Sequence, residues 1–220
     1  MHCIAYIAGL VASDGHLSTR DYRLKVVTYD KRFAEYLTRN TSLFKVYRHG
    51  KVFELYCYNK NLWNTLNKDY RIPCGKKSNT IQPPKELAPT EAVDFLRGLF
   101  DGDSSIYIVQ VKLRRKQQVY KYLLPRISFK SKSEALTNWA FNQLRKLGLK
   151  PYYSNEPTFH RFFLDGFTNL RKFHEKIGYR HPAKRKKLEG LLNFPHNYYA
   201  PVAGEGVRNS SPAEEGGPEN

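Results

Sequence analysis

The sequence has few cysteines and no long apolar run. Cys3, Cys57 and Cys74 stand alone, without the paired spacing of a zinc site or a disulfide framework. Isolated thiols suit a reducing compartment, so we expect a cytoplasmic protein, or an organelle-matrix protein if the host is a eukaryote. No stretch of about 18 apolar residues predicts a membrane span, and no basic segment followed by an apolar core predicts secretion.

Acidic residues are also scarce relative to basic ones. The 220 residues include 37 Lys and Arg but 20 Asp and Glu, which gives a formal net charge of +17. Such an excess indicates a polyanionic partner, and nucleic acid is the first candidate. A membrane surface is a poorer match, because no long basic amphipathic helix is evident. Residues 193–220 differ from the rest: they are rich in Gly, Pro and Glu, and we expect a largely disordered tail there.

An unusual pattern occurs twice in the chain. "YIAGLVASDG" runs from Tyr6 to Gly15, and "FLRGLFDGDSS" runs from Phe95 to Ser105. Each is an apolar, small-residue helix that reaches an aspartate, Asp14 or Asp103, although glycine and a C-terminal negative charge both disfavour a helix. Because the aspartates are about ninety residues apart, an internal duplication is indicated.

The same order of elements is predicted in both halves: helix, hairpin, helix, hairpin, helix. The expected elements are 2–12, 16–30, 31–39, 43–59 and 60–67, then 91–101, 105–130, 133–147, 150–166 and 167–177. "DYRIPCGKKS" and "GYRHPAKRKK" close the two halves with a shared Tyr-Arg-x-Pro. We therefore divide the chain into 1–78, a Pro-rich linker 79–90, a second half 91–192 and the tail.

The two small-residue segments resemble the signature helices of single-chain LAGLIDADG homing endonucleases. The resemblance implies an α+β fold of two pseudo-symmetric αββαββα repeats. Each repeat would supply an antiparallel sheet to a DNA-binding saddle, and the signature helices would pack together at the interface. Small residues permit such close packing, and those expected to face one another are Ala8, Gly9, Ala12, Gly98 and Gly102.

Close packing of the helices would bring Asp14 and Asp103 together. Two adjacent carboxylates repel each other unless a cation lies between them, and oxygen-only ligands suit Mg²⁺. The resemblance implies that both residues are catalytic metal ligands at a shared centre holding two or three divalent ions. Two departures stand out: Ala12 occupies the position of the signature's first Asp, which Asp101 retains, and Ser104 replaces a final Gly.

The family also implies a lysine or polar helper near the end of the first hairpin of each half. Lys130 fits that position in the second half, with Lys132 as an alternative. In the first half the alignment reaches Asp30, next to Lys31. Either the alignment slips or the centre is asymmetric, and Asp30 could equally be only the N-cap of the following helix.

The hairpins would present basic and polar side chains to the major groove and to phosphates. In the first half the candidate DNA contacts are Arg20, Arg23, Lys25, Lys45, Tyr47, Arg48, Lys51, Lys76 and Lys77. In the second half they are Arg114, Arg115, Gln117, Gln118, Lys121, Arg126, Lys132, His160, Arg161, Lys184, Arg185 and Lys186. Of these, we expect Lys76, Lys77 and the basic run from Lys184 to anchor the DNA backbone.

The resemblance implies a monomeric, magnesium-dependent endonuclease that makes a double-strand break at a long, asymmetric DNA site, as in intron homing. Two alternatives stay open. One is a LAGLIDADG RNA maturase that assists splicing, and the other is a non-catalytic DNA-binding regulator on the same fold. The two aspartates favour cleavage, because binding alone does not require them.

Overall fold

The computed structural model describes residues 4–77, 79–115, 118–154, 156, 158–193 and 199–201. The chain divides into two compact units. The first comprises residues 1–109 and 124–194 and contains most of both repeats. The second comprises residues 110–123 and 195–220, and within it the short strand β9 (Tyr199–Pro201) pairs antiparallel with β6. The rest of the predicted tail, apart from residue 193, lies outside the described residues.

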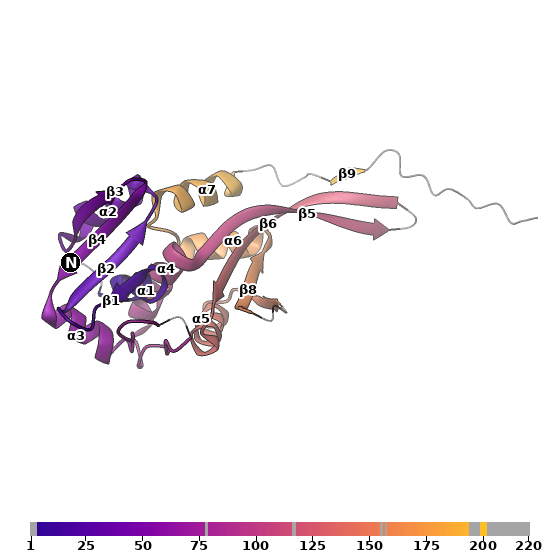
Figure 1. The fold of residues 1–220 in the computed structure, drawn as a ribbon. Helices are drawn as coiled ribbons and strands as arrows, with labels where there is room; N and C mark the ends of the chain where they lie inside the picture. Colours follow the sequence, from indigo (N-terminus) through magenta and orange to yellow (C-terminus); the bar gives the residue numbers. More distant parts are fainter. Residues whose placement is uncertain are drawn as a thin grey trace, which may run out of the picture. The chain divides into compact units, whose positions relative to one another are not determined.

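The first repeat contains three helices and four strands in the predicted order (Figure 1). They are α1 (Ile4–Asp14), β1 (Gly15–Leu17), β2 (Arg23–Thr28), α2 (Lys31–Thr41), β3 (Lys45–His49), β4 (Val52–Tyr58) and α3 (Lys60–Lys68). Side-chain caps explain two of the helix starts. Asp30 accepts hydrogen bonds at the start of α2, and Asn59 accepts one from the N–H of Leu62 at the start of α3.

The second repeat has the same order and one additional helix. Its elements are α4 (Pro89–Asp103), β5 (Ser104–Arg115), β6 (Gln118–Ser131), α5 (Glu134–Lys146), β7 (Tyr152–Ser154), β8 (His160–Asp165) and α6 (Gly166–Lys176). Helix α7 (Pro182–Leu192) follows, and our sequence analysis did not predict it. Pro182 at its first turn was the available signal, because proline is favoured at that position.

Both sheets have the same strand order, β1-β2-β4-β3 and β5-β6-β8-β7, which confirms the two-repeat α+β fold. Alternation along the strands sets the two faces of each sheet. Leu24 and Val26 of β2 are buried, as are Ile127 and Phe129 of β6. The intervening residues therefore lie on the opposite, outer face of each sheet.

Helices α1 and α4 lie side by side in the first unit (Figure 1), with glycine at their closest approach. A Cβ at Gly9 would lie 2.0 Å from the carbonyl oxygen of Phe95, and one at Gly98 would lie 2.2 Å from that of Tyr6. Only glycine permits this backbone-to-backbone contact, which confirms the expected close pairing. Ser13, rather than Ala12, faces Gly102: a Cβ there would lie 2.0 Å from the Ser13 hydroxyl oxygen.

No helix among the described residues is both long and apolar enough to cross a membrane.

Candidate active site

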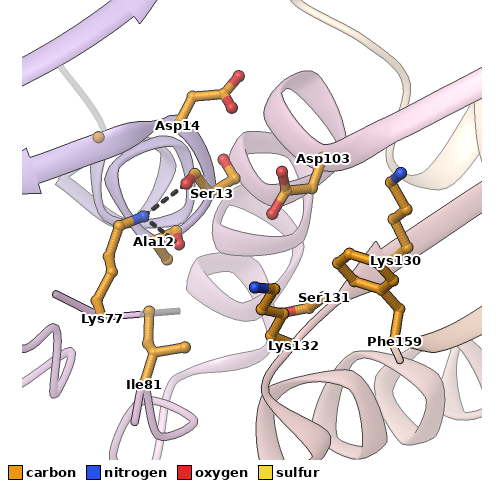
Figure 2. A pocket seen from close by; sticks show the side chains of 11 residues that line it. Ala12, Ser13, Asp14, Lys77, Ile81, Asp103, Lys130, Ser131, Lys132 and Phe159 are labelled. Atoms are coloured by element: carbon orange, nitrogen blue, oxygen red, sulfur yellow. Dashed lines mark hydrogen bonds between the residues drawn. The ribbon is translucent and has the colours of Figure 1, made fainter. Parts of the chain in front are cut away.

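Asp14 and Asp103 are the last residues of α1 and α4, so the pairing of these helices places the two aspartates at neighbouring ends. A Cβ at Gly102 would lie 3.2 Å from the Asp14 carboxylate, which brings that group against the end of α4. Both aspartates line a cavity of about 390 Å³. Figure 2 shows the two side chains at this cavity, each projecting from its own helix end.

Two lysines cap the helix ends that carry the aspartates. The ammonium of Lys77 donates to the carbonyl oxygens of residues 11, 12 and 13 at 2.6–2.7 Å, two of which Figure 2 marks. The ammonium of Lys184 donates to those of residues 100, 101 and 102 at 2.6–3.0 Å. Each lysine neutralises the negative end of a helix dipole and satisfies its last carbonyl groups.

These caps correct one of our expectations. Lys77 and Lys184 were predicted to anchor the DNA backbone, but their ammonium groups are directed at helix carbonyls inside the protein. Lys77 follows the proline of its Tyr-Arg-x-Pro segment by four residues, whereas Lys184 follows its proline by two. Lys77 and Lys184 are therefore equivalent in their positions at the two helix ends, but not in their spacing from the proline. Our comparison of the two basic runs by spacing missed this equivalence.

The carboxyl and ammonium groups of the site perturb one another. Burial, followed by the charge of Asp14, raises the pKa of Asp103 to about 6. Asp14 is open to solvent on one side, yet the packed helix ends around it desolvate its carboxyl group and raise its pKa. Burial also lowers the pKa of Lys77 and of Lys184 to about 8, against the attraction of the aspartates. Perturbed groups of this kind gather at functional sites.

Asp101 occupies a different environment from the two aspartates at the cavity. It is buried and accepts hydrogen bonds from the Tyr6 hydroxyl at 2.8 Å and from the N–H groups of Arg180 and His181 at 3.2 and 3.1 Å. It thereby fastens the Tyr-Arg-x-Pro segment of the second half to α4. Ala12, at the corresponding position of α1, cannot form such bonds.

The second repeat contributes two further lysines to the cavity wall. Lys130 lies near the end of β6 and Lys132 directly follows the strand, and the ring centroid of Phe159 is 5.2 and 5.7 Å from their ammonium nitrogens. The positive charge of Lys130, like those of Lys77 and Lys184, opposes the rise in the pKa of Asp103 that burial and Asp14 cause. Figure 2 shows both lysines on the Asp103 side of the cavity. The predicted helper is therefore near the carboxylates, although its role stays a prediction.

Asp30 does not correspond to Lys130. Asp30 caps α2 by accepting from the N–H groups of Arg32 and Phe33, and its own N–H donates to the hydroxyl of Thr28 at 3.1 Å. Ser133 begins α5 in the same way: its hydroxyl accepts from the N–H of Leu136, and its N–H donates to Ser131 at 3.1 Å. Asp30 and Ser133 are thus equivalent.

This equivalence shifts the expected alignment by three positions. The first-half counterparts of Lys130 and Lys132 become Val27 and Tyr29. The alternative in which Asp30 is an N-cap is correct. The first repeat therefore lacks both of the lysines that the second repeat places at the end of its strand.

Comparisons with solved structures find proteins of the same fold. The homing endonuclease I-DmoI, solved as mesophilic variants, matches with a TM-score of 0.55 and 15% identity over 86% of this chain and 97% of that one. LAGLIDADG meganuclease I-AabMI bound to uncleaved DNA matches with a TM-score of 0.58 and 8% identity, covering 86% and 90%. The N-terminal LAGLIDADG domain of WhiA matches with a TM-score of 0.50 and 11% identity, covering 80% of each chain.

This chain has the LAGLIDADG fold. No protein-family model matches its sequence. Among curated proteins, the replication factor C small subunit of Methanocaldococcus jannaschii is 24% identical over 197 residues, which is 84% of this chain and 10% of that protein. The chain thus spans about a tenth of the curated relative, so the activity of the whole relative does not transfer to it.

The donor set of this LAGLIDADG centre suits a hard divalent cation. The carboxylates of Asp14 and Asp103 are the anionic oxygens that the helix ends present to the cavity, and the carbonyl oxygens of Ser13 and Gly102 each accept a hydrogen bond from a lysine. Within the described residues no group of three or more His, Cys, Asp or Glu side chains gathers to hold a metal. Two carboxylates fit Mg²⁺, which keeps several waters and shares phosphate oxygens with its substrate.

Apart from Lys77 and Lys184, the predicted DNA contacts fall into three groups. Exposed side chains are those of Arg20, Lys45, Tyr47, Arg48, Lys51, Lys76, Lys132, His160, Arg185 and Lys186, although Arg48 donates to the carbonyl oxygen of Gly50 and Arg185 pairs with Glu189 at 3.9 Å. Half-buried side chains held by carboxylates are those of Arg23, Lys25, Arg126 and Arg161. Lys121 lies on β6 in the second unit, and Arg114, Arg115, Gln117 and Gln118 have side chains outside the described part of the chain.

Proposed function

We propose that this protein is a site-specific DNA endonuclease that hydrolyses one phosphodiester on each strand of a duplex. One observation carries the proposal: Asp14 and Asp103 end two glycine-packed helices and line the same cavity. Folding gains nothing from two carboxylates with raised pKa values at the negative ends of helices. An arrangement that is costly for stability is expected where the chemistry requires it.

In this proposal Asp14 and Asp103 hold Mg²⁺, two or three ions at the shared centre. When bound, the metal supplies an activated water and neutralises charge on the phosphate. Lys77 and Lys184 keep the helix ends in place through their carbonyl contacts, which fixes the separation of the two carboxylates. Lys130 contributes a positive charge on the Asp103 side, where an anionic phosphate oxygen would be stabilised.

The proposed substrate is a long, non-palindromic DNA duplex. Each repeat offers a sheet whose outer face carries basic and aromatic residues, and such a ribbon fits the major groove. The two repeats differ in these residues, so we expect different half-sites. Because one chain supplies both aspartates, a monomer suffices for the complete centre. I-DmoI and I-AabMI, which share the fold, have been solved with DNA, and I-DmoI with Mn, Mg or Ca.

A second candidate is a DNA-binding regulator without nuclease activity. The fold similarity to the LAGLIDADG domain of WhiA favours it, since the fold alone does not specify cleavage. The two candidates differ in what they require of the centre. A regulator needs the basic faces but not Asp14 and Asp103.

The decisive experiment presents the protein with a plasmid library of candidate insertion sites, with Mg²⁺ or with EDTA. We expect linear products with one common junction in Mg²⁺ alone, together with duplex binding whose log–log salt slope is steeper than about −3. Steep, site-specific binding without cleavage in either Mg²⁺ or Mn²⁺ would support the regulator instead. Absence of both binding and cleavage would contradict both candidates.

A further inference from the structure

On the outer face of each sheet, one basic side chain is held by a carboxylate and a tyrosine. We propose that these two carboxylates, Glu54 and Asp165, are positioning residues that set the base specificity of the protein. They fix Lys25 and Arg126 for contact with base edges and oppose the indiscriminate binding of phosphates. The inference rests on the proposed function in one respect: the ligand of these faces is a DNA duplex.

The first cluster lies at the centre of the four-stranded sheet. Glu54 on β4 accepts a hydrogen bond from the Lys25 ammonium on one oxygen and from the Tyr56 hydroxyl on the other. Lys25 and Tyr56 are direct cross-strand partners, and Glu54 is opposite Val27 on the next outward position. The two donors lower the pKa of Glu54, so the group remains a carboxylate at neutral pH.

Aromatic contacts order the same cluster further. The Lys25 ammonium is 5.6 Å from the centroid of the Tyr56 ring, and the Arg23 guanidinium is 5.5 Å from it. Tyr47 of β3 meets the same ring edge-on at 5.5 Å between centroids. Three strands thereby hold one tyrosine, and that tyrosine helps to hold the carboxylate beside the lysine.

The second cluster has the same components in a different arrangement. Arg126 of β6 and Asp165 of β8 are cross-strand partners joined by two hydrogen bonds of 2.7 Å. The Tyr152 hydroxyl donates to Asp165 at 2.6 Å and accepts from Arg126 at 2.8 Å. The guanidinium also lies 4.3 Å from the ring centroid of Phe163. A planar fork held by two oxygens has little freedom left to search for phosphates.

The chemistry of these clusters suits bases better than phosphates. A carboxylate repels a phosphate. A cation that is already paired with a carboxylate therefore contributes less to the release of counterions from DNA. A base edge in the major groove presents donors and acceptors side by side: guanine accepts from Lys or Arg, and cytosine donates to a carboxylate. Each cluster offers a donor beside an acceptor on the face that is expected to meet the groove. The donor and acceptor are Lys25 and Glu54 in the first cluster, and Arg126 and Asp165 in the second.

The proposal differs from a purely structural reading of the same contacts. Cross-strand ion pairs on a sheet contribute modestly to stability wherever they occur. That role requires no effect on the choice between DNA sequences. The ratio of the dissociation constants for a random duplex and a preferred duplex is therefore the informative quantity, because sheet stability alone would not change it.

The experiment uses the full chain and two charge-neutralising variants, Glu54→Gln and Asp165→Asn. The wild-type protein first selects a preferred duplex from a randomised library. Dissociation constants for that duplex and for a random duplex of equal length are then measured at one salt concentration. Glu35→Gln is the matched control, because Glu35 is a half-buried carboxylate on α2 that lies away from both sheet clusters and pairs with Lys31 at 3.7 Å.

We expect each sheet variant to bind the random duplex about 5-fold more tightly, as one further phosphate contact would allow. Discrimination between the two duplexes should fall by about 10-fold or more, the value of one good base contact. The control should leave discrimination unchanged. If a carboxylate variant fails to fold, Tyr56→Phe and Tyr152→Phe replace it in the test. Each removes one hydrogen bond from its carboxylate, so discrimination should fall by a smaller factor.

Unchanged discrimination in the folded variants, with duplex binding intact, would overturn this inference and leave the proposed function standing. A loss of discrimination as large in Glu35→Gln would overturn it as well, because net charge would then be the cause. If the wild-type protein binds no duplex, the proposed function fails, and this inference fails with it.

Discussion

An aspartate at the C-terminal end of a helix faces unbonded carbonyl groups of the same sign, and in this protein two such aspartates are neighbours. Lys77 and Lys184 offset the cost by bonding three carbonyls each. Burial desolvates both lysines, which lowers the pKa of each to about 8. The residues of the centre thus stabilise one another only in part, and the remaining cost is consistent with a site kept for chemistry.

Replacing one carboxylate at a time should separate cleavage from binding. We expect Asp14→Asn and Asp103→Asn to lower the cleavage rate by about 10³-fold or more, because each would remove one of the two proposed metal ligands. Duplex affinity should stay within about tenfold, since neither group is expected to read a base. The Asp103 variant should also melt at the same or a higher temperature at pH 8, because burial disfavours its charged form. Full activity in either variant would show that the centre is misassigned.

His181 should make the stability of the protein sensitive to acid. Desolvation, aided by the charge of Lys184, lowers its pKa from 6.5 to about 4, although Asp30 lies 3.8 Å from its Nε2 atom and opposes the shift. Between these two pKa values the unfolded chain binds a proton that the folded protein does not. The free energy of unfolding therefore falls as the pH drops from about 6.5 to about 4.

The variant that tests this is His181→Phe, which keeps the stacking on Phe33, now 4.2 Å between ring centroids. We expect the wild type to lose about 1–2 kcal/mol more than the variant over that pH window, after allowance for solvent screening. Chemical denaturation at several pH values measures the difference. The raised pKa values of Asp101 and Asp103 act in the opposite direction in both proteins and cancel in the comparison. If the free energy of unfolding depends on pH in the same way in the wild type and in His181→Phe, the pKa of His181 is not lowered by folding.

Single residues of the site were predictable where a pattern repeats and unpredictable where only the folded chain brings groups together. Asp14 and Asp103 stood out because each ends a helix of unusual composition. Lys77 and Lys184 looked like surface cations, because nothing in a basic run indicates which ammonium meets a helix end. Glu54 and Asp165 attracted no attention, since one acidic residue in a strand has no signal until the register of the sheet is known.

At the scale of elements, the pairing of α1 with α4 depends on glycine where the backbones touch. Gly98→Ala would put a methyl group 2.2 Å from the Tyr6 carbonyl oxygen. The helices must separate, which should cost about 1–3 kcal/mol. A displacement of the aspartates by about 1 Å should slow cleavage about 10²-fold. Thermal melting and single-turnover cleavage measure the two effects.

Gly190→Ala is the matched control, because a Cβ at Gly190 on α7 meets nothing within 4 Å. That substitution should stabilise the helix by up to about 1 kcal/mol and leave cleavage unchanged. If both variants melt and cut alike, close packing of α1 and α4 is not what sets the positions of the two aspartates.

Most elements were predictable from periodicity and caps, because alternation and helix-start residues are local signals. The exceptions share a physical cause. Helix α7 has a basic, weakly amphipathic sequence without the apolar period that would have marked it as a helix, so the segment was taken only as the end of the second half. The alignment of Asp30 with Lys130 was wrong by three positions, because the sequence does not show where each strand ends, whereas the hydrogen-bonded caps at Asp30 and Ser133 define the correspondence.

At the scale of the whole molecule, composition indicated the class of partner but not the cations that would meet it. The net charge of +17 counts every basic residue equally. The structure shows Lys25, Arg126 and Arg161 paired with carboxylates, and Lys77 and Lys184 directed at helix ends. The cations available to a phosphate are therefore fewer than the sequence suggests, and which ones are available depends on strand register and helix packing.

The two repeats share a topology but surround the carboxylates with different groups. The second repeat places Lys130 and Lys132 at the cavity wall, while the first has Val27 and Tyr29 at the equivalent positions. If the protein cuts DNA, the phosphate on the Lys130 side should gain stabilisation that the other phosphate lacks. We therefore expect the two strands to be cut at different rates.

A supercoiled plasmid carrying the target reports this difference, because one cut gives an open circle and two give a linear molecule. The wild type should accumulate the open circle, nicked on one particular strand. Lys130→Met should slow the first cut by about 10²-fold, since it removes the charge beside Asp103. The open circle should then carry its nick on the other strand, because the cut on the Lys130 side becomes the slower of the two. Lys31→Met removes an exposed positive charge that lies outside the cavity wall, and it should leave both rates unchanged. Equal cutting of the two strands by the wild type, or equal slowing of both by Lys130→Met, would mean that the unequal lysines at the centre do not distinguish one strand from the other.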